Sequence, residues 1–112
     1  MDERKKRIGL NETAFRSANE RIESLAHGFS LVTERSEFIC ECGFATCMER
    51  ISLTLAEYEH VRSSPTWFVI VHGHQIPDVE RLVEEHATYA IVEKLPGGPA
   101  GIAIREDERR KD

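Results

Sequence analysis

Three cysteines, Cys40, Cys42 and Cys47, lie within eight residues of this 112-residue chain, and the sequence has no others. An odd number of thiols so close together makes a poor disulfide framework. In a reducing compartment, clustered thiols are more often metal ligands or catalytic groups. A small domain has a limited core and gains much stability from a bound metal. The cluster therefore predicts a metal site around which a small fold is organised.

The spacing of the thiols suits a tetrahedral zinc ion. In an extended segment, side chains two residues apart point the same way, so Cys40 and Cys42 share a face with Cα atoms roughly 6–7 Å apart. A tetrahedral Zn²⁺ holds its sulfurs somewhat under ~4 Å apart, which modest convergence achieves. A turn through Gly43 can bring Cys47 to the same point. One histidine would complete a Cys₃His set, which is a closed, structural zinc site.

Two histidines can supply the fourth ligand. His72 and His74 both follow an apolar run that reads as a buried strand, and Gly73 between them gives the backbone freedom to aim a ring. The residue pattern does not separate the two candidates. The other histidines fit structural roles, at a helix end, on an exposed helix face and as a core or capping residue respectively: His27, His60 and His86.

Hydrophobic periodicity and turn signals predict a single small α+β domain, with helices packed on a small sheet and a hairpin held by zinc. The expected order is α-β-β-α-β-α-β: a helix over 12–27, strands over 37–42 and 49–53, a helix over 55–63, a strand over 67–71, a helix over 77–86 and a strand over 88–92. Thr54 and Glu57 form a capping box that starts the second helix.

The first helix is expected to begin after Asn11, a good N-cap residue, and to be amphipathic. Its apolar residues recur at steps of three and four and are expected to face the core: Ala14, Phe15, Ala18, Ile22, Leu25 and Ala26. Its charged residues are expected to face solvent: Arg16, Glu20, Arg21 and Glu23.

Composition predicts three regions along the chain. Residues 1–9 read as a charged lead-in, 10–95 as the domain, and 96–112 as a flexible charged tail after the element-breaking Pro96-Gly-Gly-Pro99. No apolar run approaches the ~18–20 residues that span a bilayer, and the charged start lacks the apolar core of a secretory signal. We therefore expect a cytoplasmic protein with no membrane contact.

A structural role for the metal is favoured over a catalytic one. A catalytic zinc needs an open position and a general base, for which Glu41 and Glu49 are the nearest candidates. Glu41, however, should point away from the neighbouring thiols, and both carboxylates are expected to be solvated. Three thiolates also weaken zinc as a Lewis acid. The sequence thus indicates a binding or regulatory module with an unidentified protein partner more than an enzyme.

Two alternatives remain open from the sequence. The thiols can instead serve a redox sensor or small enzyme, in which His72 or His74 activates a thiolate. The second alternative is weak nucleic-acid binding through the basic runs Arg4–Arg7 and Arg109–Lys111. A net charge of −5 argues against that function.

Several segments resemble a group of small, uncharacterised proteins of actinobacterial, hence bacterial, type. The resemblance covers roughly residues 10–95 and rests on these residues: Asn11-Glu12, Asn19-Glu-Arg-Ile22, Phe38-Ile-Cys-Glu-Cys42, Cys47, Glu49-Arg50, Leu53-Thr-Leu-Ala-Glu-Tyr58, Gly73-His74, Val79-Glu80 and Val92-Glu-Lys94. It implies that the cysteines and the Gly-His pair form one unit, which favours His74 over His72 as the fourth ligand. It implies no activity, and the tail after Pro96 has no counterpart in it.

Overall fold

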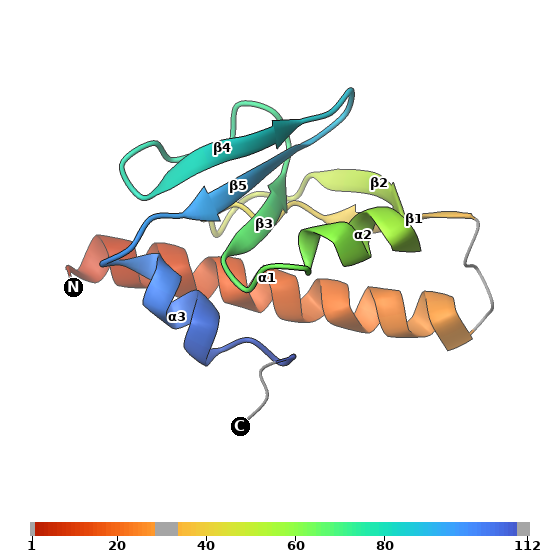
Figure 1. Ribbon diagram of the computed structural model, residues 1–112, viewed down its shortest axis with the longest axis horizontal. Coiled ribbons are helices and arrows are strands. Elements are labelled where there is room, and N and C mark those ends of the chain that lie inside the picture. Colours follow the sequence, from red (N-terminus) through yellow and green to blue (C-terminus); the bar gives the residue numbers. More distant parts are fainter. Residues whose placement is uncertain (1, 29–33, 110–112) are drawn as a thin grey trace.

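The structure is a computed structural model that describes residues 2–28 and 34–109 (Figure 1). Its elements are α1 (Glu3–Gly28), β1 (Arg35–Ile39), β2 (Arg50–Thr54), α2 (Leu55–Val61), β3 (Trp67–Ile70), β4 (Glu80–Glu85), β5 (Ala90–Lys94) and α3 (Pro99–Arg105). The α+β class and the single small domain are confirmed, and the first five elements follow the predicted order. None of the described helices combines the length and apolar character that a membrane span requires.

Two small antiparallel sheets lie on one side of the long helix α1 (Figure 1). The first sheet pairs β1 with β2, and the second has the strand order β3-β5-β4. Helix α1 packs against β1, α2 and α3. The main core lies between these layers, and its fully buried members include Phe38, Tyr58 and Phe68.

The prediction of a helix over 77–86 is wrong, because Glu80–Glu85 forms strand β4, which pairs antiparallel with β5. The register between the two strands shifts between Leu82 and Glu84, as at a β-bulge. An extra residue interrupts the two-residue alternation of a strand. Val79 lies just before β4, and Leu82 and Val83 lie within it, so the apolar residues are spaced by three and by one, a spacing that also fits a helix.

The predicted charged lead-in and flexible tail are also wrong. Helix α1 begins at Glu3, so Asn11 lies within the helix and does not cap it, and Ile8 is buried. Residues Pro99–Arg105 form α3, which packs on α1. A Cβ added to Gly9 would lie 2.9 Å from the side chain of Ile102, so this glycine permits the close approach of the two helices. Residues 110–112 lie outside the described part of the chain.

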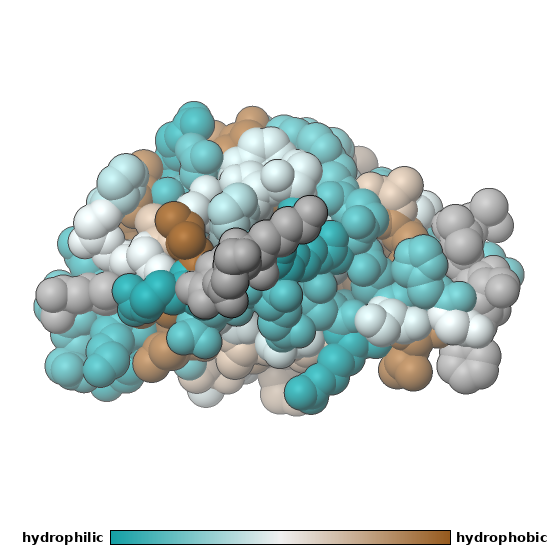
Figure 2. All heavy atoms as spheres, turned by 60° about the horizontal axis from the view of Figure 1, so that its bottom comes forward, coloured by the Kyte–Doolittle hydropathy of each residue, from teal (hydrophilic) through white to brown (hydrophobic). Residues whose placement is uncertain are grey.

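The buried face of α1 is the polar one, contrary to the predicted amphipathicity. Arg16 is only 2% exposed, and it donates hydrogen bonds to the carbonyls of Pro65 (2.8 Å) and Ala103 (2.7 Å). Leu25, predicted to face the core, is 62% exposed. Figure 2 shows the outer side of α1 and α3, where hydrophilic residues predominate and hydrophobic ones are scattered. The helix is thus held through specific hydrogen bonds and ion pairs as well as by apolar packing.

The capping box that starts α2 is confirmed. The Thr54 hydroxyl accepts from the Glu57 N–H at 3.1 Å, and the Glu57 carboxylate accepts from the Thr54 N–H at 2.8 Å. We expect Thr54→Ala to cost about 1 kcal/mol of unfolding free energy, because the first turn loses an acceptor. For a chain of 112 residues the melting temperature would fall by roughly 3–5 °C. Thr54→Ser keeps the oxygen and should melt near the parent protein; an equal loss in both variants would contradict the capping explanation.

Candidate metal centre

The segment Cys40-Glu41-Cys42 joins the two sheets. The segment follows directly after Ile39, the last residue of β1, and the backbone N–H groups of Cys40 and Glu41 then donate to carbonyls in different parts of the fold. The Cys40 N–H donates to the Glu49 carbonyl at 3.1 Å, within the β1–β2 connection. The Glu41 N–H donates to the Val69 carbonyl of β3 at 2.8 Å. The segment is therefore fixed from both sides, and the thiols of Cys40 and Cys42 lie where the sheets meet.

Two tight turns bring the other ligands to this point. The chain folds back after Gly43, and the Cys47 N–H donates to the Phe44 carbonyl at 3.0 Å. After β3, the His74 N–H donates to the Val71 carbonyl at 3.1 Å. Gly73 in this second turn has φ +85°, a conformation that side chains other than glycine rarely adopt. Glycine at this position allows the turn that aims the ring of His74 at the thiols.

Four ligand atoms converge at the junction. The sulfurs of Cys40, Cys42 and Cys47 and a ring nitrogen of His74 all lie within 4.8 Å of one another. His74 Nδ1 lies 3.6 Å from Cys40 Sγ and 3.7 Å from Cys47 Sγ. In a tetrahedral zinc site these nitrogen–sulfur edges would measure roughly 3.5 Å. The four side chains can therefore hold a metal ion with little rearrangement.

The structure separates the two histidine candidates. His74 belongs to the group of potential ligands, whereas His72 does not. The His72 side chain is exposed, and its Nε2 lies 2.6 Å from the carbonyl oxygen of His86. His86 is also exposed and follows strand β4, so its predicted role as a core or capping residue of a helix is wrong. The ring of His86 stacks on Tyr89, with centroids 4.5 Å apart.

Hydrogen bonding shifts the pKa values of the Cys40 and Cys42 thiols in opposite directions. A hydrogen bond from the Cys40 thiol is the main factor that lowers the pKa of Cys42 to about 5. The same contact, together with burial, raises the pKa of Cys40, and burial raises that of Cys47. The Val71 N–H also donates to Cys40 Sγ at 3.2 Å, a contact that favours a negative sulfur. The site thus provides donors to its sulfurs, as metal-bound thiolates require.

Burial of the thiols bears on their reactivity. Cys40 and Cys42 are 0% and 1% exposed, and only Cys47 is partly accessible. A redox-active cysteine combines a low pKa with access to the reactant. Here the thiol with the lowered pKa is the buried Cys42, and the accessible Cys47 has a raised pKa. The geometry therefore suits metal coordination better than thiol chemistry.

Glu41 is a residue beside the candidate ligands whose environment the sequence analysis assigned wrongly. It was expected to be solvated, but its side chain is completely buried. Its carboxylate accepts from Asn19 Nδ2 at 2.9 Å, from the Tyr58 hydroxyl at 3.0 Å and from the Val69 N–H at 3.1 Å. Burial raises the pKa of Glu41, and these three donors oppose that effect. Glu41 therefore connects the segment that carries Cys40 and Cys42 to α1, α2 and β3, and its carboxylate is taken up by these contacts.

No local signal in the sequence distinguishes Glu41 from an exposed glutamate such as Glu49. The carboxylate oxygens of Glu41 accept from donors on distant elements, since Asn19 is 22 residues away and Tyr58 is 17 residues away. The exposed side chain of Glu49 does not belong to the ligand group.

Comparison with family models, with curated proteins and with solved structures gives no match to this chain.

Proposed function

We propose that Cys40, Cys42, Cys47 and His74 bind one Zn²⁺ ion in a closed structural site. The observation that carries the proposal is the convergence of the four ligand atoms within 4.8 Å. Three sulfurs and one nitrogen form a donor set that selects zinc among common divalent metals, and four protein ligands leave no open position for substrate. The ion would fasten the β1–β2 connection to the end of β3. The domain would then act as a binding or regulatory module for a protein partner, in a reducing compartment such as the cytoplasm.

Two observations favour this function over the alternatives. A redox sensor is supported less well, because Cys40 and Cys42 are buried and only Cys47 of the three thiols is partly accessible. Nucleic-acid binding is supported less well, because Arg4 and Arg109, the first residues of the two basic runs, both form ion pairs within the fold. Arg4 pairs with Asp78 at 2.8 Å, and Arg109 pairs with Glu20 at 2.9 Å and with further carboxylates.

Metal content and ligand identity test the proposal together. Native mass spectrometry of the reduced protein should show one zinc per chain, which is lost with a strong chelator. His74→Ala should weaken zinc binding more than about 100-fold, because even changes to outer-shell partners cost 10–100-fold. His72→Ala is the matched control and should bind zinc as the parent does, since its ring lies outside the ligand group. A folded protein without metal, or equal losses in both variants, would refute the proposed Cys₃His site.

A further inference from the structure

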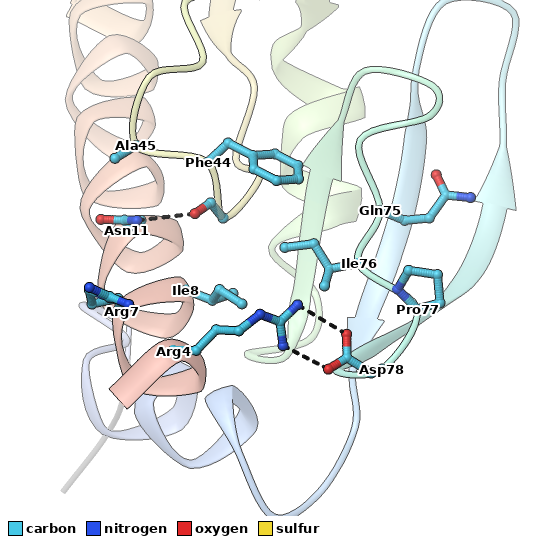
Figure 3. A pocket seen from close by; sticks show the side chains of 11 residues that line it. Arg4, Arg7, Ile8, Asn11, Phe44, Ala45, Gln75, Ile76, Pro77 and Asp78 are labelled. Carbon is cyan, nitrogen blue, oxygen red and sulfur yellow. Dashed lines mark hydrogen bonds and ion pairs between the residues drawn. The ribbon is translucent and has the colours of Figure 1, made fainter. Parts of the chain in front are cut away.

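A cavity of about 550 Å³ lies beside the metal centre (Figure 3). It is bounded by the first turns of α1, by the loop over 43–45 and by the segment over 75–78. Ile8 and Ile76 point toward one another at its base and belong to a small buried apolar cluster separate from the main core. Phe44 adds an aromatic ring that is 49% exposed. The cavity therefore offers an apolar wall that solvent can reach.

The charges that line the cavity are predominantly positive, although the whole chain carries −5. Arg4 and Arg7 both line it from α1, three residues apart and therefore on neighbouring parts of one helix face. Arg4 reaches across to Asp78 with Nη1–Oδ2 and Nη2–Oδ1 distances of 2.8 and 3.4 Å. Within the described part of the chain, Arg7 forms no ion pair. Two cations and one carboxylate thus line the cavity, an excess of positive charge that suits an anion.

One wall of this cavity is the metal-binding loop itself. Asn11 Nδ2 donates to the Gly43 carbonyl at 3.0 Å and ties the loop to α1 (Figure 3). A Cβ on Gly43 would lie 2.6 Å from Ile8 Cγ2, so a side chain at this position would displace the wall. On the other side, the Phe44 ring meets the His74 ring edge-on, with centroids 6.4 Å apart. The cavity is therefore formed by contacts within the fold.

We propose that this cavity binds a small organic anion that consists of a carboxylate on an apolar body. Its volume lies in the range of about 300–1,000 Å³ that is typical of small-molecule sites. The apolar body would lie against Ile8, Ile76 and Phe44. The carboxylate would pair with Arg4, whose exposed ion pair with Asp78 contributes little stability and can be exchanged, and Arg7 would add positive charge at the edge of the cavity. The site uses none of the four metal ligands.

The probe for this proposal is 2-naphthoate, and its uncharged match is 2-naphthamide. Titration of the isotope-labelled, purified protein, followed by amide NMR, should give saturable shifts at Phe44, Ala45 and Ile76. The double variant Arg4→Gln/Arg7→Gln should bind 2-naphthoate at least about tenfold more weakly, because charge-assisted hydrogen bonds are lost. Both arginines are exposed, so the variant should fold.

The matched control is Arg21→Gln/Arg50→Gln, which removes the same charge from exposed positions outside the cavity and should bind as the parent does. Equal weakening in both double variants would show general charge attraction and would overturn the proposal. Equal affinity for the naphthamide, or shifts elsewhere in the protein, would overturn it as well. The titration uses protein whose amide spectrum shows that it is folded, with or without bound metal at the start, so its failure is distinct from a failure of the zinc proposal.

Discussion

Removal of the proposed zinc ion is expected to unfold most of the protein. The four ligands come from the β1–β2 connection and from the turn after β3, so the ion would be a direct link between the two sheets. Structural zinc sites contribute about 10–16 kcal/mol of apparent binding free energy, which rivals the total net stability of about 5–15 kcal/mol of a domain. Circular dichroism and amide NMR before and after chelation, under reducing conditions, would measure the loss of structure.

A single ligand substitution should reproduce this effect. We expect Cys40→Ser to lower the melting temperature strongly and to abolish its dependence on added zinc, since Cys40 is both buried and central to the site. Met48→Ser is the matched control, because Met48 lies in the same connection and is 80% exposed. Its melting temperature should stay near that of the parent. If Cys40→Ser and the parent had the same melting temperature in chelator, and again the same melting temperature in added zinc, the fold would not depend on this site.

The clustering of the candidate ligands was the most predictable feature of the molecule, because its constraints are local. Cys40, Cys42 and Cys47 lie in one short segment, and the direction of side chains along an extended chain follows from backbone geometry. The choice of His74 over His72 did not follow from that geometry. It depends on the turn at Gly73, which aims one ring toward the sulfurs and leaves the other against the carbonyl of His86.

The buried polar face of α1 was harder to predict. Glu12, Arg16, Asn19 and Glu23 recur at helical spacing, as the apolar residues of the same helix do. Periodicity alone therefore supported two opposite orientations. The orientation is decided by partners far away in the chain, such as Lys94, which pairs with Glu12 and Glu80. A rule that apolar residues face inward fails where buried charges find such partners.

Loss of the Glu41 carboxylate is expected to be the second most damaging change. Glu41→Ala would leave three donors without their acceptor: the Asn19 amide, the Tyr58 hydroxyl and the Val69 N–H. An unsatisfied buried polar group costs about 1–3 kcal/mol, so we expect a total loss of roughly 3–5 kcal/mol in unfolding free energy. Chemical denaturation of the zinc-loaded protein would measure it.

Two further variants identify the cause of that loss. Glu41→Gln keeps the side-chain volume but turns one acceptor into a donor, so we expect a loss of about 1–3 kcal/mol through hydrogen bonding without a cavity. Glu49→Ala removes an exposed carboxylate from the same connection and should change stability by less than about 0.5 kcal/mol. Because Glu41 fixes the backbone between two ligands, Glu41→Gln should also weaken zinc binding. If Glu41→Gln were as stable as the parent and bound zinc equally well, the carboxylate would not position the metal-binding segment.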